Sequence, residues 1–241
     1  MIDSNISFIK KKAKLFLLHY AGGNVYSYQF LIPLLNDFDV IPLELPGRGK
    51  RAKEPLLKLF EEVSVDLYNL ILNQVQEEEF LIYGHSMGAY LGLKITDMLN
   101  GINKKPVCLI VSGNPGPGIK DDLQRHLLDD CEFIRELKKI GGIPSEIFAN
   151  NEVLNYFLPI LRADFEVAEN NNLDSTRASD VPIFAMMGDQ EEKCEQISNW
   201  NRFTSGSFDF KIMKGGHFFI RENPELLAGI IRKCYDENII S

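Results

Sequence analysis

The sequence predicts a single α/β domain, in which a mostly parallel central sheet carries helices on both faces and a helical insertion. Short apolar runs typical of buried strands alternate with segments whose apolar residues recur at helical spacing, and this alternation indicates parallel strand pairing. The 241 residues are 45% hydrophobic and 25% charged, which suits one large domain, residues 1–241, with a well-buried core. Ligand chemistry is then expected at the carboxyl ends of the strands.

The expected strands are short and spread along the whole chain. They fall near residues 14–19, 38–43, 80–83, 107–112, 181–187 and 208–213. Helical spacing is found near residues 61–77, 88–99 and 193–203, and again after Pro224. One interval, at about 115–178, shows no strand pattern and continues helix after helix. The simplest interpretation is a lid over the active edge of the sheet, and the alternative is helical packing away from the site.

Charge and cysteine content exclude several classes of function. The formal net charge of −8 and the pI near 5.1 argue against nucleic acid as a partner, because phosphate backbones are bound by basic surfaces. The four cysteines have neither C-x-x-C spacing nor nearby histidine pairs, so they indicate no metal site and no disulfide framework. The N-terminus lacks the pattern of a signal peptide, and no apolar run is long enough for a membrane span. We therefore expect a cytoplasmic monomer that binds no membrane.

The stretch GHSMG, residues 84–88, has the pattern G-x-S-x-G between a predicted strand and a predicted helix. A nucleophilic serine has to stand clear of the sheet on a strained turn, and flanking glycines spare the neighbouring strand and helix a side-chain clash. Ser86 is the predicted nucleophile. It lies at the start of a helix, where free backbone N–H groups help to stabilise an oxyanion.

A serine nucleophile needs a base and an acid, and in this architecture the chain order is Ser, acid, His. Of the four histidines, only His217 follows both a strand and a possible acid. The acid should follow the strand near 181–187 and orient the imidazole. Glu191 has the usual spacing, three residues after a glycine, whereas Asp189 has the commoner side chain in a less usual place. Both are candidates.

The loop after the first strand, LHYAGGN at residues 18–24, is suited to supply the second oxyanion donor. Gly22 and Gly23 let the backbone turn toward a substrate, and the N–H of Ala21 would act together with that of Met87. A phosphate-binding loop is the competing idea. It is weak, because the stretch lacks a G-x-G-x-x-G or G-K-[ST] frame.

Six segments, in this order and at these distances, resemble the type II (editing) thioesterases of nonribosomal peptide and polyketide synthesis, which have the α/β-hydrolase fold. They are HYAGGN, LELPGRGKR, IYGHSMGAYLGL, GGIPSE, YFLPILRADFEV and GGHFFI. G-x-S-x-G is shared by many hydrolases, so the P-G-R-G-x-R and L-R-A-D segments are what make the resemblance specific.

The resemblance implies hydrolysis of acyl groups from the phosphopantetheine thiol of acyl or peptidyl carrier proteins. No cofactor is implied, since the substrate carries the phosphopantetheine arm. Matched residue by residue, the nucleophile falls on Ser86, the base on His217 and the oxyanion donors on Ala21 and Met87. The acid of the family, normally aspartate, falls on Glu191.

Two further groups of residues each allow a functional and a structural interpretation. Apolar side chains of the predicted lid could wall an acyl channel or form plain core: Phe133, Ile134, Phe157, Leu158 and Leu161. Basic side chains in PGRGKRAK could meet an acidic carrier or a phosphate, or surround a structural ion pair made first of all by Arg51: Arg48, Lys50, Arg51 and Lys53.

Two rival functions remain open. One is a stand-alone acyl-carrier or acyl-CoA thioesterase of fatty acid metabolism, or a small-molecule esterase on the same fold. The other is a binding module without hydrolytic activity, against which the full set of serine, acid and histidine speaks.

Overall fold

Six strands form one sheet in the order β2-β1-β3-β4-β5-β6, and every pairing between them is parallel. The computed structural model describes residues 11–119 and 121–239, so the first ten residues, part of the stretch in which we expect no signal peptide, lie outside the described range. The α/β prediction is confirmed, with strands within a few residues of their expected places. They are β1 (Lys14–Leu18), β2 (Asp39–Pro42), β3 (Phe80–His85), β4 (Leu109–Ser112), β5 (Ile183–Gly188) and β6 (Phe208–Met213).

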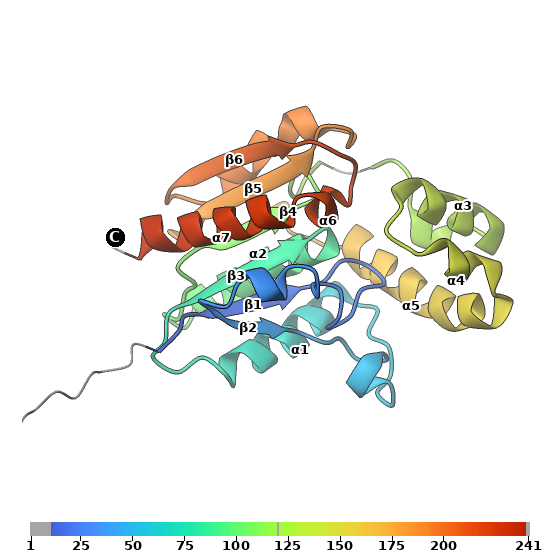
Figure 1. Cartoon of the computed structure of the whole chain (residues 1–241), viewed down its shortest axis with the longest axis horizontal. Helices are drawn as coiled ribbons and strands as arrows, with labels where there is room; N and C mark the ends of the chain where they lie inside the picture. Colours follow the sequence, from blue (N-terminus) through green and yellow to red (C-terminus); the bar gives the residue numbers. More distant parts are fainter. Residues whose placement is uncertain (1–10, 120, 240–241) are drawn as a thin grey trace, which may run out of the picture.

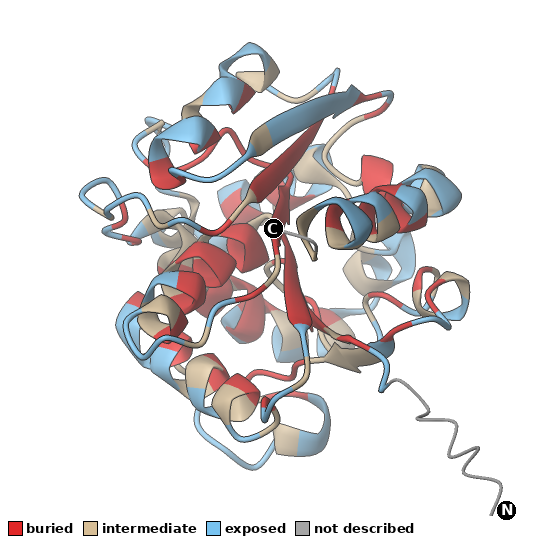
Figure 2. Cartoon of the chain, turned by 90° about the vertical axis from the view of Figure 1, so that its left-hand side faces the viewer, coloured by how far each residue is buried: buried red, intermediate tan, exposed pale blue. Residues whose placement is uncertain are grey.

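The inner strands are apolar at nearly every position because both faces of the sheet are covered. Successive side chains of a strand point to opposite faces, and in β1 Phe16 packs into one buried cluster while Leu15 and Leu17 pack into the other. Figure 2 shows the buried positions gathered on the strands and on the inner sides of the helices. Helices α1 (Phe60–Leu72) and α2 (Met87–Asn100) cover the first face, and α7 (Pro224–Asn238) covers the second.

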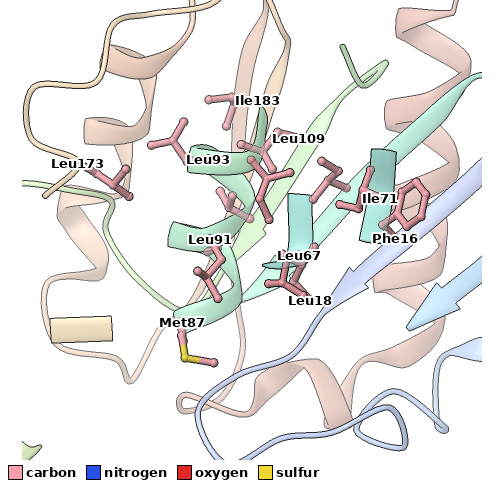
Figure 3. Close-up of a cluster of buried hydrophobic side chains, with 14 of the residues drawn as sticks. Phe16, Leu18, Leu67, Ile71, Met87, Leu91, Leu93, Leu109, Leu173 and Ile183 are labelled. Carbon is pink, nitrogen blue, oxygen red and sulfur yellow. The ribbon is translucent and has the colours of Figure 1, made fainter. Parts of the chain in front are cut away.

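Helix α2 is anchored in the core from its first residue. Met87 is 1% exposed, and Leu91 and Leu93 follow on the buried side of the helix, against the strands (Figure 3). Burying a leucine or methionine side chain stabilises the fold by about 1.5 to 3 kcal/mol. The core therefore fixes the first turn of α2, and with it the residue just before the helix.

A helix is present where the sequence predicted one, near 193–203, and it is a 3₁₀ helix, η4 (Cys194–Phe203), rather than an α-helix. Its buried side chains are Ile197, Trp200 and Phe203, three residues apart. At three residues per turn these side chains align along one face, whereas in an α-helix the same spacing would spread them over an arc of about 120°. Packing against the sheet thus outweighs the usual preference for the α-helix.

The predicted insertion holds a set of helices that gathers beyond one end of the sheet (Figure 1). Their inner side chains form a small apolar cluster of their own, separate from the two sheet clusters. No helix in the described part of the chain combines the length and apolar character needed to cross a bilayer. The inserted helices are η3 (Arg125–Leu127), α3 (Asp130–Ile140), α4 (Ser145–Ala149) and α5 (Asn151–Glu169).

Candidate active site

Ser86 alone forms the turn between β3 and α2. The strand ends at His85 and the helix begins at Met87, so the turn is tighter than the span 84–88 read from the sequence. Ser86 has φ 57° and ψ −117°, a conformation that costs a residue with a side chain about 1 to 3 kcal/mol. Its N–H donates a 2.7 Å hydrogen bond to the carbonyl of Ser112, which helps to hold the strained turn.

The two glycines of the motif are required by backbone packing. A Cβ atom on Gly84 would lie 2.1 Å from the carbonyl oxygen of Gly88, and one on Gly88 would lie 2.2 Å from that of Leu18. Neither approach leaves room for a side chain, since the clashing atoms are backbone. Strand β1, strand β3 and helix α2 therefore meet directly beneath Ser86.

A support for Ser86 that we did not predict comes from the loop after β4. Asn114 donates through Nδ2 to the carbonyl of Ser86 at 2.9 Å, and Trp200 donates through Nε1 to the carbonyl of Asn114 at 3.0 Å. Asn199 donates to two proline carbonyls in the same loop. The sequence signal was the glycine- and proline-rich stretch SGNPGPG, which predicts an ordered loop but does not show that the loop supports Ser86.

His217 lies in the loop between β6 and the short helix α6 (Phe219–Glu222), and its ring contacts a carboxylate. Its Nδ1 is 2.6 Å from Oε2 of Glu191, whose other oxygen accepts the Gly188 N–H at 2.7 Å. The Glu191 side chain is only 7% exposed. When Nδ1 donates to a carboxylate, Nε2 of the neutral ring is free to accept a proton, as a general base requires.

Asp189 takes a different place in the same loop. Its Oδ1 accepts a 2.9 Å hydrogen bond from the N–H of Gly215, and its own N–H donates to the carbonyl of Met213. Asp189 thus ties the end of β5 to the loop that carries His217. Of the two acids left open by the sequence, the structure brings Glu191 to the imidazole and uses Asp189 to shape the backbone.

Ser86 and His217 line one cavity. Its volume is about 840 Å³ when the open solvent at its mouth is included. Ala21 lines it from the loop after β1, and the inserted helices form its other wall. Of the five lid residues singled out in the sequence, Phe157 and Leu161 reach the cavity. The other three pack in the apolar cluster of the insertion: Phe133, Ile134 and Leu158.

Of the two expected oxyanion donors, one directly follows Ser86 in the chain and the other lines the same cavity. Met87 is the first residue of α2, where a backbone N–H has no partner within the helix, and Ala21 lines the cavity with Ser86. Gly22 follows with φ +76°, a conformation that favours glycine. These N–H groups and the positive end of the helix dipole suit a developing negative charge.

The residues of the basic loop after β2 divide between the functional and the structural interpretation. Arg48 is buried against Asp164, so the hypothesis that it presents a free charge to a partner is wrong. Arg51 pairs with Asp66 and Glu54, as its structural interpretation requires. Lys50 and Lys53 are exposed and are the cations that the loop offers to solvent.

Two other histidines are buried close to the site. Burial lowers the pKa of His85 well below 6.5, and burial together with the nearby Arg48 lowers the pKa of His19 to about 4. The Nδ1 of His85 bonds the hydroxyl of Ser112, and that of His19 bonds the Tyr20 carbonyl. Both rings therefore remain neutral near pH 7 as part of the scaffold.

These histidines predict acid-sensitive stability. The unfolded chain takes up protons on both rings below pH 6.5, while the folded chain does not until lower pH. Stability is therefore full above that pH and falls on acidification, by up to about 1.4 kcal/mol per pH unit for each ring. Chemical denaturation from about pH 7 to about pH 5.5 would measure the slope. His19→Gln should make it shallower, and an unchanged slope would contradict the assignment.

Comparisons with known proteins identify the family of the chain. The Thioesterase domain family matches residues 13–235. Thioesterase PikA5 of Streptomyces venezuelae is 30% identical over 215 residues, which are 87% of this chain and 76% of PikA5. The medium-chain S-acyl fatty acid synthase thioesterase of Rattus norvegicus is 28% identical over 92% of this chain and 88% of its own length.

A solved structure, that of YbtT, the type II thioesterase of the yersiniabactin NRPS/PKS pathway, superposes with a TM-score of 0.87. It is 25% identical in sequence, and the match covers 95% of each chain. Within residues 11–119 and 121–239, no three His, Cys, Asp or Glu side chains form a group that could hold a metal ion. The chain belongs to the thioesterase family, a thioester hydrolase on the α/β-hydrolase fold.

Proposed function

We propose that this protein releases acyl groups from the phosphopantetheine thioester of carrier proteins, as a type II thioesterase that clears misprimed or stalled units from nonribosomal peptide or polyketide synthases. The observation that carries the proposal is the cavity into which Ser86 and His217 both open, under a wall of apolar lid residues. The kinship with PikA5 and YbtT supports the pathway class. We also propose that the enzyme acts in the cytoplasm.

The first half of the reaction transfers the acyl group to the enzyme. The Ser86 Oγ attacks the thioester carbonyl carbon while Nε2 of His217 takes the hydroxyl proton. Glu191 stabilises the imidazolium that forms, and the N–H groups of Ala21 and Met87 stabilise the oxyanion. The carbon–sulfur bond then breaks, and the departing thiolate takes the proton from His217. The carrier leaves with a free thiol.

The second half returns the enzyme to its starting state. A water molecule attacks the acyl-serine carbonyl, and His217 takes a proton from that water. When the bond to the Ser86 Oγ breaks, His217 returns this proton to the serine, and a carboxylic acid is released. Thiolate is a better leaving group than alkoxide, so a Ser–His pair with two backbone donors is sufficient for the acylation step.

A second candidate is a thioesterase of fatty acid metabolism that acts on acyl-carrier or acyl-CoA thioesters. The rat relative favours it, because its match spans most of both chains. The two functions differ in the acyl groups and carriers they accept. Intact-mass spectrometry of a carrier domain loaded with several acyl groups, before and after incubation with the enzyme, would separate them. Hydrolysis confined to simple fatty acyl chains would favour the second candidate, as would a higher kcat/KM for an acyl-CoA than for the same acyl group on the carrier domain.

If a carrier protein docks on the enzyme, the enzyme should prefer acyl groups on a carrier to the same acyl groups on a small thiol. We expect kcat/KM for an acyl group on its carrier to exceed that for the same acyl group on CoA or a short pantetheine, because only the carrier adds protein contacts. Lys50 and Lys53, exposed after β2, are the cations expected to meet an acidic carrier. Lys50→Glu/Lys53→Glu should then lower kcat/KM for the carrier substrate by about tenfold or more, and spare the pantetheine substrate.

A matched control changes the charge equally at the opposite edge of the sheet, where the parallel strands β1 and β2 begin. Lys11 and Lys12 are exposed just before that strand begins, so Lys11→Glu/Lys12→Glu should leave both substrates unaffected. Equal losses on carrier and pantetheine for the Lys50/Lys53 variant would show that the basic loop is structural and does not dock a carrier.

A further inference from the structure

We infer that Arg48 and Asp164 are positioning residues that hold the oxyanion loop, residues 20–23, against lid helix α5. The inference rests on the proposed serine-hydrolase function of the same site. It gives α5 a part in setting the catalytic geometry as well as in lining the cavity. Neither residue lines the cavity that holds Ser86 and His217, so both act through the backbone of the oxyanion loop.

The pair is bidentate and buried. Arg48 donates from Nη1 to Oδ2 of Asp164 at 2.5 Å and from Nη2 to Oδ1 at 2.6 Å. The side chains are 6% and 1% exposed. A fork-to-fork arrangement of this kind fixes both the distance and the orientation of the two groups. Arg48 comes from the loop after β2 and Asp164 from the middle of α5, so the pair joins the body of the fold to the lid.

Both partners also bond the oxyanion loop itself. The N–H of Gly22 donates to Oδ2 of Asp164 at 2.7 Å, and Nη1 of Arg48 donates to the carbonyl of Gly23 at 3.2 Å. One carboxylate oxygen therefore receives both the guanidinium and the loop. The peptide that Asp164 holds directly follows Ala21, whose N–H is the expected oxyanion donor. A shift of this peptide would move that donor.

Packing on α5 gives the loop a second constraint. A Cβ atom on Gly22 would lie 2.4 Å from Cδ2 of Leu161, and φ of Gly22 is +76°. Leu161 lies one turn before Asp164 on the same helix. The loop thus lies directly on one face of α5, where Leu161 fills the space that a Gly22 side chain would need and Asp164 accepts the Gly22 N–H. The position of the loop follows that of the helix.

Removal of one partner and of both should have different consequences. A lone buried charge costs several kcal/mol, whereas replacing both charges by neutral groups of similar size is much less destabilising. Arg48→Gln and Asp164→Asn should each lower the melting temperature. The double variant Arg48→Gln/Asp164→Asn should recover part of that loss, so the fold can be kept while the charged, bidentate clamp that fixes the loop is lost, even though an asparagine oxygen can still accept the N–H of Gly22.

The test measures kcat and KM of the double variant on an acyl-pantetheine thioester, and the Ki of an acyl trifluoromethyl ketone, which forms a tetrahedral adduct at Ser86. We expect kcat to fall by about 10²-fold and Ki to rise by a similar factor, while KM changes less than about threefold. Arg48→Lys keeps the positive charge but cannot make two parallel hydrogen bonds to the carboxylate, so it should show an intermediate loss of kcat. It also decides the question if the double variant does not fold.

Arg51 and Asp66 offer the matched control. They form a second bidentate pair, with contacts of 2.6 and 2.7 Å, from the same basic loop but without a contact to residues 20–23. Arg51→Gln/Asp66→Asn should therefore keep kcat and Ki within about threefold of the parent. Two results would overturn the inference. In one, the Arg48/Asp164 double variant is folded and as active as the parent. In the other, its KM and Ki rise by the same factor.

A further measurement separates this inference from the proposed function. The rate at which a fluorophosphonate labels Ser86 needs no thioester and no carrier. If the parent protein is not labelled, the serine-hydrolase proposal itself fails. If the parent is labelled and the Arg48/Asp164 double variant is labelled equally fast, only the positioning role fails.

Discussion

Replacement of Ser86 by alanine should lower kcat by about 10⁴ to 10⁶-fold, the range expected when a member of a catalytic triad that acts as a unit is removed. No other group in the proposed mechanism forms the acyl-enzyme. The fold should be nearly unaffected, because alanine fits the space of serine and meets the same backbone strain at φ 57°. The melting temperature should stay close to that of the parent.

The measurement combines kinetics with intact-mass detection of the acyl-enzyme. The parent protein should gain the mass of the acyl group during turnover of a slow substrate, and Ser86→Ala should not. Ser207→Ala is a suitable control, since Ser207 is exposed at the start of β6 and lies away from the cavity. Activity of Ser86→Ala within tenfold of the parent would exclude Ser86 as the nucleophile.

Local pattern was enough to predict the fold and the loops that carry the chemistry. Strands buried on both faces are apolar throughout, and a serine between two glycines at a strand-to-helix junction is typical of a nucleophile held on a tight turn. The close backbone contacts beneath Gly84 and Gly88 are the physical reason for that motif. Chain order also limited the base to His217, because each of the other histidines lies in or before the insertion.

Pairs between residues far apart in the chain could not be predicted from the sequence. Arg48 and Asp164 are separated by 116 positions, and nothing local shows that the guanidinium is buried against helix α5. The sequence left a surface and a structural interpretation open for the basic run and favoured Arg51 as the structural residue; the structure pairs Arg51 as expected and also buries Arg48. The 3₁₀ form of η4 was missed for a related reason, since only the packed sheet decides which spacing buries its three large side chains.

The identity of the triad acid, Glu191 or Asp189, can be tested with matched variants. Glu191→Gln keeps the size of the side chain but removes the charge that stabilises the imidazolium, so kcat should fall by about 10²-fold or more. Asp189→Asn is the matched change two residues earlier. Its oxygen can still accept the N–H of Gly215, and we expect a modest loss of stability with kcat close to that of the parent.

A third variant tests the reach of the side chain. Strand β5 ends at Gly188, whose N–H already holds one oxygen of Glu191, so the other can meet Nδ1 of His217 at 2.6 Å only with the full length of a glutamate. Glu191→Asp keeps the charge but shortens the chain by one methylene, and it should recover only part of the activity lost in Glu191→Gln. If Asp189→Asn instead abolishes turnover while Glu191→Gln does not, Asp189 is the acid of the triad, and the hydrogen bond between Glu191 and His217 serves only to hold the loop.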